Sequence, residues 1–293
     1  MISILIGIPT LNCASRLYRC LDAIAECTPF DRYQIKVMVC DDGSTDVELA
    51  ANKAVLFDQE KLLRDASLEM LMHQARRGIS AGWNSLTRFQ PADVVVLLND
   101  DIEVVPDWLD VLVYSVTKNP RLGMVSLNQY TGLTKGQHRA AFAKMLPHEA
   151  QPILAYHEAK LMTGQGQLLA SHGSIFAFRR EVYDLVGGFD ERYFCFYEEL
   201  DFGVSLREHG FAHAVASYPI VYHMGGATLS EPKNLDAKMQ LARSRGLFHE
   251  KWQTSIAAMR EKYRVQLVGD LNEWNTAILH LDDRDVGVPA PSV

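Results

Sequence analysis

The sequence predicts an α/β fold in which helices cover a mostly parallel central sheet. Short β-rich apolar runs alternate with helical patterns through the first half of the chain, as crossover connections require. The strand predicted at 93–98 carries an uninterrupted apolar run, which is typical of a central strand buried on both faces. Polar turns follow several of these runs, so their loops are expected to meet at one edge of the sheet.

The elements of the first half follow from the spacing of their apolar residues. In the helix expected after its cap residue Ser15, apolar residues recur from Leu17 to Ile24 at i, i+3, i+4 and i+7, which lines one helix face. The expected strands are 2–8, 35–39, 68–73 and 93–98, and the expected helices are about 47–66, 80–89 and 106–116. Strands and helices therefore alternate as successive units of one sheet.

Regular patterns weaken from 128 to 172 and then return. A stretch of this length without clear periodicity is often a functional loop in a compact domain. Beyond it we expect strands at 173–178 and as a pair around 212–222, helices near 180–186 and about 199–209, and a turn at Gly187–Gly188. Amphipathic spacing around 235–242 and 252–263 predicts two helices that pack over the edge of the sheet.

Composition excludes several classes of protein. With 293 residues, 48% of them hydrophobic, the chain is long enough for one large domain or two modest ones and is neither disordered nor fibrous. Its 29 Lys and Arg against 36 Asp and Glu give a net charge of −7, and no basic run is present, so no nucleic-acid partner is expected. The five cysteines form no CxxC motif, which argues against a disulfide framework or a structural zinc site.

Location is predicted from what the apolar segments lack. No apolar stretch approaches the roughly 18–20 residues that cross a bilayer. The apolar N-terminus has no basic region before it and soon reaches Pro9, unlike a secretory signal peptide. We therefore expect a cytoplasmic protein.

Polar clusters follow three of the predicted strands. The clusters are Pro9–Asn12, Asp41–Asp42 and Asn99–Asp101, and all three are expected to face one crevice at the carboxyl edge of the sheet. The oxygens of Asn99, Asp100 and Asp101 are hard ligands that suit Mg²⁺ or Mn²⁺. The alternative for such a triplet is a plain turn, because Asn and Asp often close turns through their own backbone.

Three carboxylates lie within four residues in the second half. Glu198, Glu199 and Asp201 directly follow the aromatic run 193–197. Apolar neighbours and mutual repulsion are expected to raise the pKa of at least one of them, as a general base working near neutral pH requires. The alternative is an acidic first helical turn that complements the helix dipole.

Two further residues are candidates for ligand binding. His223 precedes a glycine pair and is either a metal ligand or a partly buried histidine with a satisfied hydrogen bond. Arg76, next to Arg77, either meets phosphate or ribose or belongs to a solvated surface pair. The dinucleotide fingerprint, the P-loop and the G-x-S-x-G elbow are all absent, so the corresponding classes of enzyme lose support.

In their order and spacing, these motifs resemble the family 2 glycosyltransferases, which are inverting nucleotide-sugar enzymes with the GT-A fold. The resemblance covers about residues 1–228. The matching segments are Ile8–Asn12 for an opening P-x-x-N loop, Val39–Asp46 for a VDDGSTD loop, Gly78–Asn84 for a G-x-x-x-x-x-N helix start, Leu97–Asp101 for the D-x-D strand end, Gly187–Glu191 with Phe196–Asp201 for a GGFDE and ED-x-D segment, and His223 for an H-x-x-G position. Asn99 stands where D-x-D has its first Asp, and Glu199 stands where many members have Asp.

The resemblance implies a role for each matching residue. Glu199 would be the general base, with Glu198 and Asp201 as neighbours that could share its work. Asp101 would hold a divalent cation, Mn²⁺ or Mg²⁺, and His223 would complete the cation's shell. The expected nucleotide-sugar-binding residues are Pro9, Thr10 and Asn12 around base and ribose, Asp41 and Asp42 at the pyrimidine, Asn99 and Asp100 near ribose and metal, and Arg76, Gly78 and Asn84 on the same side.

The resemblance also implies a domain plan and an activity. The plan is a catalytic domain at 1–228, with a nucleotide-sugar-binding half at 1–127 and an acceptor half at 128–228, then a helical extension at 229–283 and a flexible tail at 284–293. The activity is inverting transfer of a sugar from a UDP or dTDP donor to a hydroxyl of a glycan, lipid-linked or other acceptor, in the cytoplasm or at the inner face of the membrane. A nucleotidyltransferase and a non-catalytic sugar-nucleotide or glycan-binding protein are the alternatives.

Overall fold

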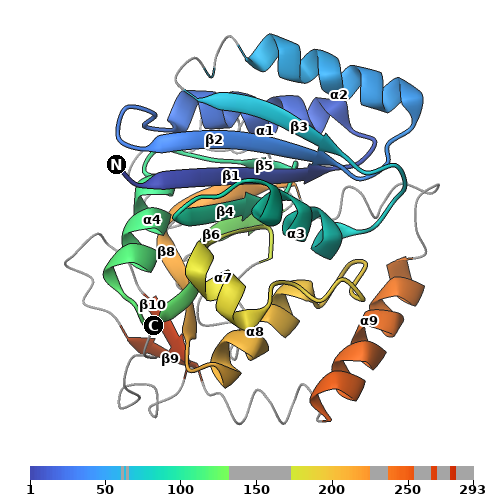
Figure 1. Cartoon of the computed structure of the whole chain (residues 1–293). Coiled ribbons are helices and arrows are strands. Elements are labelled where there is room, and N and C mark those ends of the chain that lie inside the picture. The colour runs from blue at the N-terminus through green and yellow to red at the C-terminus, as the bar shows by residue number, and fades with distance from the viewer. Residues whose placement is uncertain are drawn as a thin grey trace, which may run out of the picture.

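The computed structural model describes residues 1–60, 63, 66–131, 173–224, 237–253, 265–268 and 278–281 (Figure 1). Most of the loop predicted at 128–172, all but the first two residues of the helix predicted at 252–263, and the tail at 284–293 lie outside these residues. Among the described helices, none combines the length and the apolar character that crossing a bilayer requires.

One mixed sheet forms the centre of the described chain. Its strands are β1 (Ser3–Thr10), β2 (Gln34–Asp41), β3 (Ser67–Met72), β4 (Val94–Leu98), β5 (Ile102–Glu103), β6 (Leu122–Thr131), β7 (Ile175–Arg179), β8 (Ala212–His223), β9 (Val265–Val268) and β10 (Ile278–Leu281). They are ordered β3-β2-β1-β4-β7-β6-β8-β10-β9, and β5 pairs with β8. The strands from β3 to β4 are parallel, while β7 is antiparallel to both β4 and β6.

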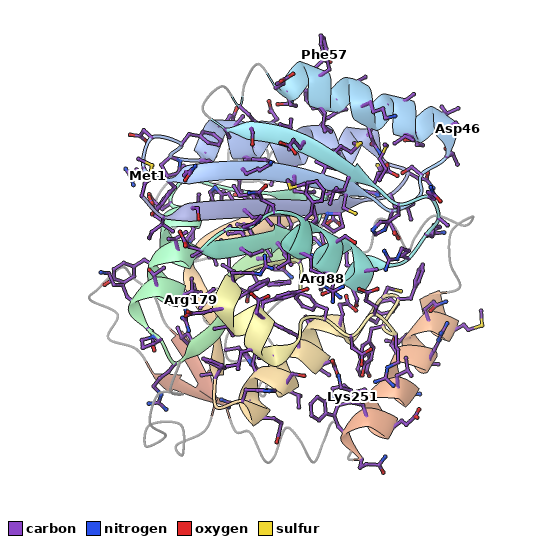
Figure 2. All side chains as sticks on the ribbon, viewed as in Figure 1. Met1, Asp46, Phe57, Arg88, Arg179 and Lys251 are labelled. Atoms are coloured by element: carbon purple, nitrogen blue, oxygen red, sulfur yellow. The ribbon has the colours of Figure 1, made fainter. Side chains whose placement is uncertain are left out.

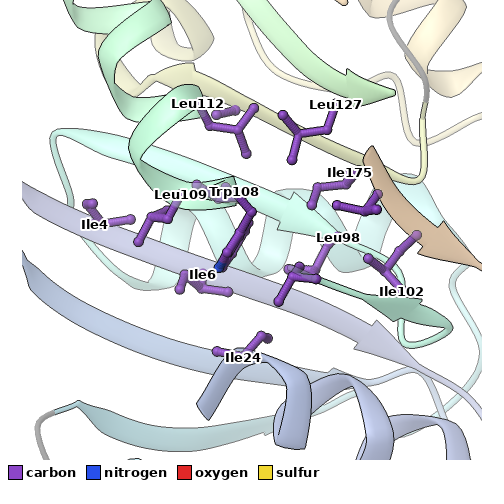
Figure 3. Packing of buried hydrophobic residues seen from close by; sticks show 14 of the residues in the cluster. Ile4, Ile6, Ile24, Leu98, Ile102, Trp108, Leu109, Leu112, Leu127 and Ile175 are labelled. Atoms are coloured by element: carbon purple, nitrogen blue, oxygen red, sulfur yellow. The ribbon is translucent and has the colours of Figure 1, made fainter. Parts of the chain in front are cut away.

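Helices cover both faces of this sheet (Figure 1). They are α1 (Ala14–Cys27), α2 (Asp46–Gln59), α3 (Ile79–Phe89), α4 (Trp108–Lys118), α7 (Arg180–Val186), α8 (Glu198–Glu208) and α9 (Ala237–Trp252). The core on one face joins α1 and α4 to the sheet around Trp108, as Figure 3 shows, and the core on the other face joins α3, α7 and α8 around Trp83. Alternate residues of the strands, such as Ile4 and Leu5 in β1, supply the two cores, as the pleat requires.

The structure confirms the α/β fold and the strands and helices predicted before residue 120, except that the helix predicted at about 47–66 ends at Gln59. The residues of α1 predicted to form one stripe are all buried, although Cys13 rather than Ser15 precedes the helix. The strand β4 is buried along its whole length, as predicted for a central strand.

The predictions for the second half need three corrections. The predicted strand pair around 212–222 is the single strand β8, whose register with β6 shifts between Ala216 and Ile220. The helix α9 does not cover the edge of the sheet, because it packs through Phe248 against Val204 of α8. The extension at 229–283 is not wholly helical, because β10 pairs with β8 and continues the sheet.

Candidate functional site

The loops after β1, β2 and β4 meet at one edge of the sheet, as predicted. Asn12 joins the first two, because its backbone N–H donates to Ser44 Oγ (2.9 Å) and its Oδ1 accepts from the N–H of Thr45 (2.9 Å). Thr10 joins the first to the third by donating its hydroxyl to Asp100 Oδ2 (2.7 Å). Pro9 precedes Thr10 in β1 and is in register with Cys40 of β2.

The two carboxylates at the end of β2 accept hydrogen bonds from neighbouring groups. Asp41 accepts from the N–H of Ser44 (2.8 Å) and from the side-chain amide of Asn52 (2.8 Å). Asp42 is buried and accepts from the backbone N–H groups of Arg77 (2.9 Å) and Gly78 (2.8 Å). Both side chains therefore shape the turns at this edge of the sheet.

The side chain of His73, which the sequence analysis did not single out, supports Asp42. Its Nδ1 lies 2.8 Å from Asp42 Oδ1, and its Nε2 lies 2.9 Å from Ser85 Oγ of α3. The imidazole thus connects the end of β3 to the loop after β2 and to α3. A pyrimidine ring bound at Asp42 would therefore meet a carboxylate held in one orientation.

The start of α3 is in close contact with the segment before the acidic cluster, which is Glu198, Glu199 and Asp201. Gly78 has φ +90, and a Cβ at this position would lie 2.3 Å from the carbonyl oxygen of Phe194, so only glycine fits. The next N–H, of Ile79, donates to the same carbonyl (2.9 Å). The guanidinium of Arg76 lies 6.0 Å from the centre of the Phe194 ring. The start of α3 and the segment before Glu198 are therefore in direct contact.

Asn84 uses its whole hydrogen-bonding capacity inside the protein. Its Nδ2 donates to the carbonyl oxygen of Phe189 (2.8 Å) and to Glu191 Oε1 (2.9 Å). Its Oδ1 accepts from the Tyr183 hydroxyl (2.7 Å) and from the N–H of Phe189 (3.0 Å), and the residue is fully buried. In this arrangement Asn84 supports the Gly-Gly-Phe-Asp-Glu loop. No polar atom of its side chain is left to bind a nucleotide sugar, which is the role that the sequence analysis predicts for it.

Asn84→Ala is expected to lower the free energy of unfolding by about 4 kcal/mol, because it leaves several buried polar groups without partners. Urea denaturation monitored by circular dichroism measures this loss. The half-buried Asn119, replaced in the same way, would lose its side-chain bond to the N–H of Arg121 and serves as the control. A loss below about 1 kcal/mol for Asn84→Ala would contradict the structural role.

The two neighbouring carboxylates after β4 have different surroundings. Asp100 is buried and accepts from Thr10, and the Arg16 guanidinium of α1 lies 3.4 Å from its Oδ1. Burial raises the pKa of Asp100 to about 6, and the charge of Arg16 opposes this rise. Because both of its oxygens have partners in the protein, Asp100 is less available to a cation than Asp101.

Asp101 and His223 lie together, as the sequence analysis predicted for a cation site. The antiparallel pairing of Ile102 with His223 joins β5 to β8 and leaves the Asp101 Oδ1 to His223 Nε2 distance at 3.3 Å. Neither Asp101 Oδ1 nor His223 Nδ1, both buried, has a hydrogen-bond partner within the described residues. A carboxylate oxygen and an imidazole nitrogen that lack such partners suit Mn²⁺ or a similar cation. Among the described residues, no third His, Cys, Asp or Glu completes a metal-binding group.

The acidic cluster begins α8 in a strained position. Phe196 and Tyr197 both have left-handed φ values, +66 and +72, which cost non-glycine residues free energy and are common at functional sites. Burial, followed by the charge of Glu199, raises the pKa of Glu198 well above its ordinary value. Burial also raises the pKa of Glu199, although backbone N–H groups at the helix start lower it.

The space around Glu199 is narrow. A Cβ on Gly173, just before β7, would lie 2.8 Å from Glu199 Cδ. One oxygen of each glutamate, Glu198 Oε2 and Glu199 Oε2, is buried without a hydrogen-bond partner in the described part of the chain. Two buried, adjacent carboxyls with unused oxygens are suited to accept a proton.

Comparison with known proteins identifies the family. Residues 3–243 match the family described as glycosyltransferase like family 2. The chain belongs to glycosyltransferase family 2. The match includes the loops after β1, β2 and β4, the acidic cluster and His223.

Two curated relatives of this family 2 chain are similar over part of its length. One is N-acetylglucosaminyl-diphospho-decaprenol L-rhamnosyltransferase of Mycobacterium tuberculosis, 27% identical over 154 residues, which are 48% of this chain and 50% of the relative. The other is O-antigen biosynthesis protein RfbC of Myxococcus xanthus, 30% identical over 125 residues, which are 40% of this chain and 10% of the relative. The matched region is thus half or less of each relative.

Solved structures share the GT-A fold of this family 2 chain. Mannosyltransferase PcManGT from Pyrobaculum calidifontis, in complex with GDP-Man and Mn²⁺, has a TM-score of 0.60 and 19% identity, covering 86% of this chain and 64% of its own. GalNAc-T7 with UDP, GalNAc and Mn²⁺ has a TM-score of 0.59 and 16% identity, covering 94% and 53%. At these identities the likeness concerns the fold alone.

Asp201 has hydrogen-bond partners that Glu198 and Glu199 do not share. Its Oδ2 accepts from Lys251 Nζ (2.7 Å), and its Oδ1 accepts from Trp252 Nε1 (2.9 Å) and the Tyr193 hydroxyl (3.2 Å). The side chain is buried and fully engaged, so the structure favours a supporting role for it.

Sequence reasoning did not single out Arg16, His73 or Lys251. Arg16 could have been found, because it lies four residues before Cys20 on the buried face of α1, where a charge needs a partner. His73 and Lys251 carry no such signal, since their partners are distant in the sequence.

Proposed function

We propose that this family 2 chain transfers a sugar from a nucleoside-diphosphate donor to an acceptor hydroxyl, with inversion at the anomeric carbon. The observation that carries the proposal is the placement of Asp101 against His223 at the same sheet edge as the loops of Asn12 and Asp42. The donor would be a pyrimidine nucleotide sugar, UDP- or dTDP-linked, with its base near Asp42 and its ribose near Thr10 and Asn12.

Asp101 and His223 would hold a divalent cation, Mn²⁺ or Mg²⁺, at the donor diphosphate. The 3.3 Å distance between Asp101 Oδ1 and His223 Nε2 supports this assignment, as does the lack of a hydrogen-bond partner for Asp101 Oδ1 among the described residues. The Mn²⁺ present in two solved structures of the same fold also supports it. When bound, such a cation neutralises charge on the departing nucleoside diphosphate. Because Asp100 is engaged with Thr10 and Arg16, it would orient the loop rather than bind the cation.

Glu199 would remove the proton from the acceptor hydroxyl as that oxygen attacks the anomeric carbon. Attack from the face opposite the leaving diphosphate inverts the configuration and requires no covalent enzyme intermediate. The buried, unpartnered Oε2 and the raised pKa of Glu199 support this role. Glu198 shares the environment and would modulate the proton affinity of its neighbour.

The acceptor would be a hydroxyl of a glycan or of a lipid-linked sugar. The name of the mycobacterial relative, a rhamnosyltransferase acting on a diphospho-decaprenol, supports a lipid-linked acceptor, and the myxobacterial relative's name supports polysaccharide synthesis. A protein with such an acceptor would work in the cytoplasm, in contact with the inner face of the membrane.

Calorimetric titration with UDP, dTDP, GDP and ADP, each with Mn²⁺ and with a chelator, tests the donor site. We expect one pyrimidine diphosphate to bind in a metal-dependent way, after which its sugars are tested for transfer. A purine that binds without metal would contradict the roles of both Asp42 and Asp101. Binding of donor and acceptor without turnover would favour a non-catalytic binding protein.

A further inference from the structure

The conformation of the segment 193–197, before the two glutamates, depends on contacts with other elements. It ends in the consecutive left-handed residues Phe196 and Tyr197, an arrangement that persists only when surrounding contacts impose it. On one side the segment contacts the start of α3, through the N–H of Ile79 and the hydroxyl of Ser80. The other side requires a second support.

The helix α9 provides this second support. The Ser244 hydroxyl donates to the carbonyl oxygen of Cys195 (2.7 Å), one residue before the left-handed pair. Phe248 is fully buried, and its ring centre lies 5.6 Å from that of Tyr197. Figure 1 shows α9 beside α8 at the periphery of the described chain, so the helix contacts the acidic segment rather than the sheet.

Lys251, near the end of α9, bonds to residues on both sides of the segment 193–197. Its Nζ donates to Asp201 Oδ2 (2.7 Å) and Asp190 Oδ2 (3.1 Å), and Figure 2 labels it on the last turn of the helix. Trp252 adds its Nε1 bond to Asp201 Oδ1 (2.9 Å). Lys251 thus pairs with two carboxylates, one before the segment 193–197 and one in the first turn of α8, and Arg192 supplies a second positive charge to Asp190.

We propose that Lys251 is a positioning residue for Glu199. By pairing with Asp190 and Asp201 together, it fixes the segment 193–197 and the first turn of α8 relative to each other. Asp201 lies two residues after Glu199, and its N–H donates to the carbonyl oxygen of Tyr197 (2.8 Å), so its anchoring is transmitted directly to the start of the helix. The inference rests on the proposed function only for the role of Glu199 as the base.

Hydrogen exchange of the full chain, without any ligand, measures the ordering directly. In Lys251→Met, which keeps the length and removes the charge, we expect amides within 193–204 to exchange at least about tenfold faster, the effect of losing charge-assisted hydrogen bonds. Lys251→Arg keeps the charge and is expected to restore slow exchange. Lys53→Met, the same change at an exposed position of α2, is the control. Unchanged exchange in Lys251→Met would overturn the proposal.

Transfer kinetics then separate positioning from general stability. We expect Lys251→Met to lower kcat at least about tenfold, with the KM for the donor within about twofold of the wild-type value, and Lys251→Arg to recover most of kcat. Faster exchange with an unchanged kcat would overturn the positioning role.

A second variant keeps the proposal testable. If Lys251→Met does not fold, Lys251→Gln, which removes the charge but keeps a polar side chain, provides the same comparison. If the wild-type protein neither binds a nucleoside diphosphate nor transfers sugar, the proposed function fails and the role as a base falls with it. The exchange result still decides whether Lys251 orders the segment.

Discussion

Glu199→Gln is expected to reduce sugar transfer by about a thousandfold, the usual contribution of general base catalysis. Glutamine has nearly the same shape but cannot accept the acceptor's proton. Because the donor contacts proposed for Asp42, Asp101 and His223 lie on other elements, nucleotide affinity is expected to stay within about twofold of wild type. Single-turnover transfer and calorimetry measure the two quantities separately.

Two control variants sharpen this test. Glu198→Gln alters the adjacent carboxyl and is expected to lower the rate less than Glu199→Gln, because Glu198 is proposed only to modulate its neighbour. Glu181→Gln changes an exposed glutamate of α7 and should leave transfer unchanged. If Glu199→Gln transfers sugar at the wild-type rate, the base lies elsewhere in the site.

The same assignment fixes the direction of the pH dependence. A base works in its deprotonated form, and burial raises the pKa of Glu199 above the ordinary 4.5. The rate of the wild-type protein should therefore fall as the pH drops through this raised pKa, at a pH above 4.5. A wild-type rate that stays constant down to pH 4.5 would contradict a buried carboxylate base. Rates measured between pH 4.5 and 8 decide this.

Local patterns predicted the sheet well because strand and helix periods are properties of neighbouring residues. The uninterrupted run 93–98 and the stripe in α1 required no knowledge of distant contacts. The short segments 265–268 and 278–281 were missed as strands, because four residues give too little pattern to distinguish a strand from a loop. The strand β8 was predicted as a pair, although it is one strand whose register with β6 shifts between Ala216 and Ile220.

The candidate site was predictable in its residue types and less so in its contacts. The motif around Asn84 was visible, but its four partners inside the protein come from α7 and the loop after it, which no spacing in the sequence indicates. Asp201 was grouped with Glu199 by adjacency, whereas Lys251, fifty residues away, gives it a different role. Tertiary contact, not sequence distance, separates these carboxylates.

Asp101→Ala is expected to remove the metal-dependent part of nucleotide binding. The change deletes the carboxylate oxygen that lies 3.3 Å from His223 Nε2. Loss of a direct ligand should weaken Mn²⁺-dependent binding at least about a hundredfold, more than loss of an outer-shell partner. Titration of the diphosphate with and without Mn²⁺, together with direct Mn²⁺ binding followed by electron paramagnetic resonance, measures the effect.

His223→Ala and Asp58→Ala complete the comparison for the cation site. His223→Ala is expected to weaken Mn²⁺-dependent binding as much as Asp101→Ala, because the pairing of β5 with β8 brings the two side chains together. Asp58 is an exposed aspartate of α2, so its removal takes away the same charge without touching the site. Normal Mn²⁺-dependent affinity in Asp101→Ala would exclude it as a ligand. A loss of affinity equal to that in Asp58→Ala would mean that net charge, rather than coordination at Asp101 and His223, governs binding.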